Sequence, residues 1–191
     1  MDKRFLAAFL TPRATRLLGY TLYPWCLKHR LQLTALESPL ITGKDVTVGD
    51  LIIFAKVCAE KPLDGRIGLN DRWHLLRLGF SKDGLLKSYR LAGEHMRADT
   101  WPKFWDQPKT EGGEARCGGI PWALSVLSNL LRNGLTLEEA LHLPEAQAVW
   151  LSTANSVHAG AKIEVLTTDD EALLDSLATV ERPTNEPKSA V

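Results

Sequence analysis

The sequence predicts an all-α fold: a single compact domain of about seven helices, with a long loop at 99–119 and a disordered C-terminal tail. Apolar residues recur at intervals of three and four over most of the chain, which is the spacing of an amphipathic helix. Several of these segments begin with a helix-start signal, either a capping residue or a proline. Only 162–166 alternates as a short strand or extended link does. We therefore divide the chain into an N-terminal arm or short helix at 1–21, a helical domain at 22–179 and a disordered tail at 180–191.

The first predicted helices follow a short apolar arm. The arm carries a stripe of apolar residues at helical spacing, and Pro12 ends it. A helix at 24–37 has Pro24 in its first turn and ends before Ser38, because a residue that precedes proline avoids the helical region. The stripe of the arm consists of Phe5, Leu6, Phe9 and Leu10.

A helix at 47–60 is the predicted centre of the core, since it is apolar on most sides. Thr47 and Asp50 have the spacing of a capping box, with Asp in the place of the usual Glu. Asn70 or Asp71 is expected to cap the next, short helix, which Gly79 ends. A further helix at 83–98 is expected to turn six residues inward: Leu85, Leu86, Tyr89, Ala92, Gly93 and Met96.

The second half of the chain is the most regular part of the sequence. Pro121 begins a helix that Gly134 stops, and Thr136 with Glu139 forms a second capping box for a short turn of helix. A longer helix follows from Glu145 to about His158. The inner face of the first of these helices is predicted to hold Ala123, Leu124, Leu127, Leu130 and Leu131.

The last predicted helix runs to about Thr179. Thr168 and Glu171 resemble a third capping box, and the acidic residues of the first turn favour the positive end of the helix dipole. Capping explains this acidic cluster without a metal ion. The polar, proline-containing segment that follows has the composition of a disordered tail.

Composition bounds the function. The 191 residues carry no formal net charge and 45% are apolar, which suits a core of ordinary size and disfavours bulk electrostatic binding to nucleic acid or anionic membrane. Residues 1–37 have six basic and two acidic side chains, whereas 136–191 have three basic and ten acidic ones. Such asymmetry suits two ordinary solvated faces, or a head and a tail that complement each other within one molecule or between copies.

The cysteines and the apolar runs indicate a reducing cytoplasm. The three cysteines are widely spaced and form no CxxC pair, and Cys26 and Cys58 fall within apolar helical patterns. No segment has the continuous apolar length of a membrane span. We therefore expect no membrane association.

No arrangement of residues predicts catalysis, a cofactor or a metal site. The glycine-rich segment 111–119 lacks the GKS or GKT of a phosphate-binding loop, and the five histidines lie at no ligand spacing. Cys117 is the one nucleophile placed in a loop, but no partner histidine is positioned for it. An enzyme that uses Cys117 therefore stays an alternative to a non-enzymatic role.

A second alternative is a nucleic-acid-binding regulator. Such a protein would read DNA with the basic head, and it requires Arg13, Arg16, Lys28 and Arg30 on one exposed face. These basic residues are few and widely spaced in the sequence, and the aromatic residues near them are expected to pack in the core.

The best candidates for partner binding are aromatic. Trp101, Phe104 and Trp105 lie in a six-residue stretch of the long loop, and Pro102 stiffens the backbone of this stretch. Large aromatic side chains are costly to leave in water, so they fold back onto the core or anchor a partner. Trp150, on the inner face of the helix that begins at Glu145, is the fourth candidate.

Several segments that together span most of residues 17–174 carry a family resemblance. They are LLGYTLYPWCLKH with the later SPL, DLIIFAKVCAE, PKFWDQ, PWALSVLSNLLRNGLTLEEALHLPEAQAVWLSTA and TTDDEALL, and the clearest is a helix, a turn and a second helix that bears Trp150. In this layout the chain resembles bacteriophage and prophage tail assembly chaperones and their small helical relatives. The resemblance implies a non-enzymatic role in which tail components, including the helical tape-measure protein, are held until the tube polymerises. Such a role needs an exposed apolar groove for amphipathic partner helices and a modest affinity.

Overall fold

The chain is mostly helical, as the sequence predicts. The computed structural model describes residues 2–10, 15–59, 66–96, 100–105 and 121–180. These residues form ten helices and four short strands, so the prediction of an all-α fold with about seven helices is not exact. The helices are α1 (Lys3–Leu10), α2 (Leu27–Ala35), α3 (Pro39–Thr42), α4 (Val48–Val57), α5 (Leu69–Gly79), α6 (Lys82–Met96), α7 (Trp122–Arg132), α8 (Leu137–His142), α9 (Glu145–His158) and α10 (Thr168–Val180). The strands are β1 (Thr15–Leu17), β2 (Tyr20–Leu22), β3 (Lys103–Phe104) and β4 (Val165–Leu166).

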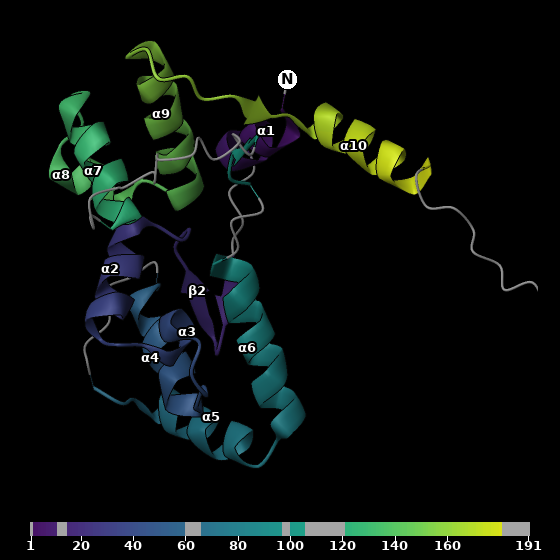
Figure 1. The fold of residues 1–191 in the computed structure, drawn as a ribbon. Coiled ribbons are helices and arrows are strands. Elements are labelled where there is room, and N and C mark those ends of the chain that lie inside the picture. The colour runs from purple at the N-terminus through teal and green to yellow at the C-terminus, as the bar shows by residue number, and fades with distance from the viewer. Residues whose placement is uncertain (1, 11–14, 60–65, 97–99, 106–120, 181–191) are drawn as a thin grey trace, which may run out of the picture.

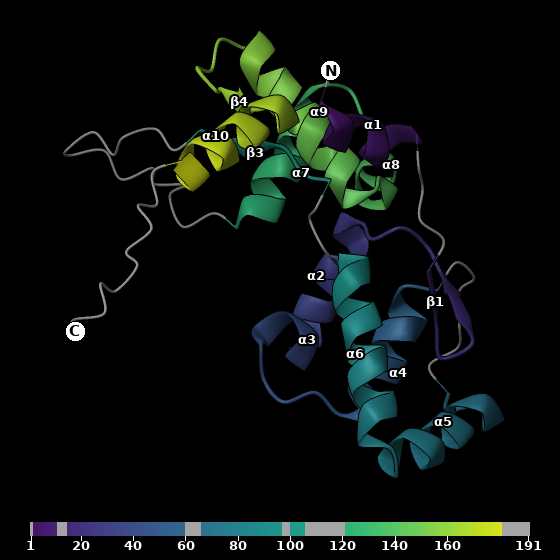
Figure 2. The ribbon, with the colours of Figure 1, turned by 90° about the vertical axis from the view of Figure 1, so that its right-hand side faces the viewer.

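Two groups of elements lie one above the other in both views (Figures 1 and 2). The lower group contains the β1–β2 hairpin and α3 to α6, and the upper group contains α1, α7 to α10 and the β3–β4 pair. The buried apolar side chains form two corresponding clusters. Helix α2 lies between the groups, because Leu33 belongs to the lower cluster and Leu27 to the upper one.

The β1–β2 hairpin is an element that the sequence does not predict; its first strand and its turn lie in the segment 1–21, which is expected to be an arm or short helix. The strands are antiparallel, with Leu17 opposite Tyr20, so Leu18 and Gly19 form a two-residue turn. Both turn residues have positive φ, 51° and 81°, which is the conformation of a type I′ turn. Leucine rarely occupies this position, so the sequence lacks the Asn-Gly or Asp-Gly signal that normally marks such a hairpin. Leu17 and Leu22 turn inward and are buried.

Helix α4 is the centre of the lower cluster. The Thr47 capping box is confirmed: Asp50 accepts from the Thr47 backbone N–H at 2.8 Å, and its own N–H donates back to Thr47 Oγ1. Leu51, Phe54 and Ala55 are fully buried. Four elements pack against this helix: α2, strand β2 of the hairpin, α5 and α6.

Two predictions for α5 and α6 are wrong. Helix α5 is capped by Gly68, and Asp71 lies inside the first turn, where it accepts the Gly68 N–H at 2.8 Å. On α6, Leu86 and Tyr89 are 57% and 46% exposed rather than turned inward. The inward face of α6 is narrower than predicted, because the helix packs along one side only, against the hairpin, α4 and α5.

The upper cluster is built on the pair α7 and α9, with α8 at its side. The predicted capping box of Thr136 and Glu139 is confirmed. Leu127 and Leu130 are buried as predicted, but Leu124 and Leu131 are 51% and 39% exposed, since α9 covers a narrower face of α7 than the leucine pattern suggests.

The last elements differ from the prediction by small shifts. The capping box of α10 is formed by Thr167 and Asp170, one residue before the predicted pair of Thr168 and Glu171. Strand β4 falls within the predicted extended segment and pairs with β3, which lies inside the segment 99–119 that was expected to be an irregular loop. The rest of that loop at 106–120, with Cys117, and the predicted tail after Val180 lie outside the described residues.

Candidate protein-binding surface

Three of the four candidate aromatic residues lie on the segment 100–105, which is held against β4. Lys103 and Phe104 pair with β4, and the Trp105 N–H donates to the Glu164 carbonyl at 3.2 Å. Phe104 and Trp105 are 45% and 40% exposed. These two aromatic side chains are therefore presented to solvent from a backbone that hydrogen bonds fix in place.

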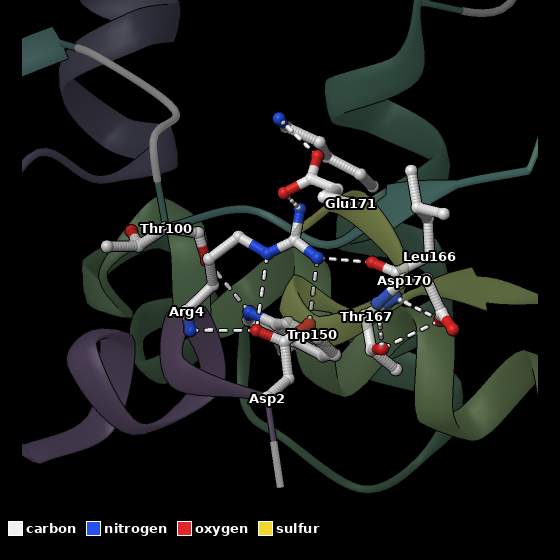
Figure 3. A network of polar contacts seen from close by, with 9 residues as sticks. Asp2, Arg4, Thr100, Trp150, Leu166, Thr167, Asp170 and Glu171 are labelled. Atoms are coloured by element: carbon white, nitrogen blue, oxygen red, sulfur yellow. Dashed lines mark hydrogen bonds and ion pairs between the residues drawn. The ribbon is translucent and has the colours of Figure 1, made fainter. Parts of the chain in front are cut away.

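Trp150 has a different environment from the other three. Its indole Nε1 donates to the Thr100 carbonyl at 2.8 Å (Figure 3). Its ring packs edge-on with the ring of Phe5 of α1, with 5.6 Å between the centroids. The side chain is half-buried. Trp150 thus connects α9, α1 and the start of the aromatic segment.

A residue that was not singled out from the sequence, Trp122, joins the exposed aromatic residues. Its ring packs edge-on with that of Trp101, with 5.0 Å between the ring centroids, although the two residues are far apart in the sequence. Trp122 is 38% exposed. We name Trp101, Phe104, Trp105 and Trp122 the aromatic surface. No spacing rule pairs Trp122, the first residue of α7, with a residue of an extended segment, so the sequence could not reveal this contact.

Arg30 of α2 contacts one member of the aromatic surface, Trp122. Its guanidinium lies 4.9 Å from the ring centre of Trp122 and 5.5 Å from that of Trp25, within the range of cation–π attraction. The same guanidinium binds Glu145 with both Nε and Nη2, at 2.7 and 2.8 Å. Glu145 is only 1% exposed, so this two-pronged ion pair ties α2 to the first turn of α9.

A second polar network anchors α1 and α10 (Figure 3). Arg4 is 7% exposed and binds the Asp2 carboxylate at 2.8 Å, the Leu166 carbonyl and, at 3.5 Å, Glu171. Burial by itself would raise the pKa of Asp2, but the hydrogen bonds and charge of Arg4 outweigh it and hold that pKa below its ordinary value. Lys103 of β3 also pairs with Glu171, so the network reaches the aromatic segment.

Two histidines lie in an aromatic cluster where α2, α4 and α6 meet. The rings of His29 and His95 lie 5.9 and 6.4 Å from Trp25, and His95 lies edge-on to Phe54. Burial lowers the pKa of both histidines to about 4, and the charges of His95, Lys28 and His142 add to the effect at His29. Both side chains are therefore neutral near pH 7, and they belong to the core.

The chemistry that the alternatives require is not assembled in the described part of the chain. Cys26 and Cys58 are buried, and burial raises the pKa of each thiol above its usual range. Cys117 lies outside the described residues. Among the residues that the structure describes, no three His, Cys, Asp or Glu side chains come together as metal ligands.

Three of the four basic residues of the N-terminal part lie in the described ranges, and their surroundings differ. Arg16 is exposed on β1, whereas Lys28 of α2 contacts His142 Nε2 at 3.0 Å and Arg30 is held by Glu145. Arg13 lies outside the described residues.

Comparison with known proteins gives no match: no protein-family model, no curated protein and no solved structure is significantly similar to this chain. Within the described ranges, none of the helices combines the length and the apolar character needed to cross a membrane.

Proposed function

We propose that this is a non-enzymatic protein that binds other proteins during assembly of a bacteriophage or prophage tail, in the cytoplasm of the bacterial host. The observation that carries the binding role is the aromatic surface, above all Phe104 and Trp105, which are exposed on a segment fixed by β4. The tail as the place of action comes from the sequence resemblance. The partners we propose are helical tail components such as the tape-measure protein.

The aromatic surface has the properties of a binding anchor. Trp and Phe side chains supply large contact areas, and they bind best when little freedom is lost on association. Here the backbone is already ordered by the β3–β4 pair, and Trp101 rests on Trp122, which in turn rests on Arg30. An amphipathic partner helix would lay its apolar side chains between these rings.

Co-elution tests this proposal. The chain is produced together with each protein encoded beside its gene, and complexes are isolated through a tag on the chain. We expect a tail component to co-elute, and we expect the double variant Phe104→Ala/Trp105→Ala to lose it. Tyr89→Ala is the matched control, because Tyr89 is an aromatic residue of similar exposure, 46%, on the lower group of helices. Elution of the wild-type chain without any tail component would contradict the proposal.

A further inference from the structure

Helix α10 projects from the upper group of elements and makes little contact with them (Figures 1 and 2). Its start is anchored, since Thr167 caps it and Glu171 pairs with Arg4 and Lys103. Beyond that first turn, every residue from Ala172 to Ser176, and Leu177 after them, is exposed. Residues 172–177 of the helix are thus open to solvent.

The exposed part of α10 has an apolar stripe. Leu173, Leu174 and Leu177 are 60%, 41% and 53% exposed, and their spacing of three and four places them on one side of the helix. A helix of 13 residues is marginal in water on its own, and most helices are stabilised by packing of their apolar side. We expect another surface to cover these leucines.

A second apolar stripe lies on α5, at the other end of the molecule. Leu69, Trp73, Leu76 and Phe80 follow one another at intervals of four, three and four, so they share one face of the helix and the residue after it. They are 84%, 61%, 61% and 91% exposed. We name these four residues the α5 stripe. The opposite side of α5 is the one that packs on the core, through Asp71 and Leu78.

The charges beside the two stripes are complementary. Arg72 and Arg77 are exposed on either side of the α5 stripe, and neither forms an ion pair with another described residue. Helix α10 carries no basic residue, and its first turn is acidic. Asp170 caps the helix and Glu171 pairs with Arg4 and Lys103, whereas Asp169 is exposed. The lengths also agree, since helices of 11 and 13 residues span roughly 16 to 20 Å.

The two stripes cannot meet within one molecule. In both views α5 lies at the bottom of the lower group, whereas α10 leaves the upper group (Figures 1 and 2). We propose that α10 of one copy packs on the α5 stripe of a second copy, with the leucines of α10 against Trp73, Leu76 and Phe80 and with Asp169 near the flanking arginines. Because each copy uses a different surface toward each neighbour, the contact is head-to-tail and produces rings or open chains.

Sedimentation velocity of the purified chain over a range of concentrations tests this inference. We expect the wild-type chain to form species larger than a dimer as its concentration rises. The variants Leu173→Gln/Leu177→Gln and Trp73→Gln/Phe80→Gln should each bind themselves at least about tenfold more weakly. Leu86→Gln is the control, because Leu86 is 57% exposed on α6, outside both stripes, and it should associate as the wild type does.

Mixing the two double variants is the decisive step. Each retains one intact stripe, so an equimolar mixture should form a one-to-one complex that grows no further. A contact between two α5 stripes or between two α10 helices predicts no such complementation. The inference is overturned if the wild-type chain stays monomeric at its highest soluble concentration, or if the mixture stays monomeric. All three variants keep the aromatic surface intact, so this result is separate from the test of tail-protein binding.

Discussion

At the scale of single residues, buried charge decides which parts of the chain are held together. Glu145 is almost completely removed from water, and its carboxylate is compensated by the guanidinium of Arg30. The pair joins α2 to α9 and so connects the two groups of elements. A buried carboxylate that loses its partner costs far more than the intact pair contributes, because desolvation is then uncompensated.

Arg30→Met is therefore expected to lower the free energy of unfolding by about 3 kcal/mol. The second change, Glu145→Leu, should restore much of this loss in the double variant, since no buried charge remains. Urea denaturation of the wild type, both single variants and the double variant measures the effect. A double variant that is less stable than Arg30→Met would show that the pair contributes through packing and not through charge compensation.

The two buried histidines predict a loss of stability in mild acid. Their pKa is lowered to about 4, whereas an unfolded histidine titrates near 6.5. Between these values the unfolded chain binds protons that the folded chain does not, so stability falls as the pH falls from about 6.5 to about 4. The loss should approach about 3 kcal/mol for each histidine, and it should be nearly complete below pH 4.

Urea denaturation at pH 7, 5.5 and 4.5 measures this dependence. The double variant His29→Leu/His95→Leu should have a much flatter profile over the same interval. Carboxylates with lowered pKa, such as Asp2 and Asp71, contribute mainly at the acid end, because their unfolded values lie near 3.8. An unchanged slope in the double variant would mean that other groups cause the dependence.

At the scale of elements, local signals predict where helices exist better than how they pack. The capping boxes at Thr47 and Thr136 were readable because each depends on residues three apart in the sequence. The hairpin at 15–22 was missed because Leu18 occupies a turn position that normally signals itself with Asn or Asp. The outward position of Leu86, Tyr89 and Leu124 depends on which neighbouring helix covers each face, and periodicity does not contain that information.

The cap of α10 gives a direct test at this scale. Thr167 Oγ1 accepts the Asp170 N–H, whereas Thr168 lies in the first turn of the helix and makes no such bond. Thr167→Ala should destabilise α10 by about 1 kcal/mol, which corresponds to roughly fivefold faster amide exchange along the helix. Thr168→Ala is the matched control and should leave exchange nearly unchanged. A larger effect of Thr168→Ala than of Thr167→Ala would contradict this cap and place the helix start one residue later, at the pair of Thr168 and Glu171 that the sequence predicts.

At the scale of the whole molecule, the chain presents separate exposed surfaces on a two-part helical body. The aromatic surface includes β3 and the contact between Trp101, which precedes β3, and Trp122 at the start of α7. The α5 stripe and α10 lie toward opposite ends of the molecule (Figures 1 and 2). Of the four residues chosen from the sequence, Phe104 and Trp105 are the most open, and Trp150 holds the segment in place. The contact between Trp101 and Trp122 was invisible in the sequence because it depends on the tertiary fold.

The most direct test of the account is the affinity of the purified chain for the tail component that co-elutes with it, measured by calorimetry. We expect a dissociation constant in the micromolar range, which corresponds to a binding free energy on the order of −8 kcal/mol, because an assembly partner must be released. Phe104→Ala/Trp105→Ala should weaken binding by at least about thirtyfold, which is the loss of an aromatic hot spot, and Tyr89→Ala should leave it unchanged. Equal affinities for the wild type and the double variant would contradict the role of the aromatic surface, and the absence of binding to every tail component would contradict the proposed function itself.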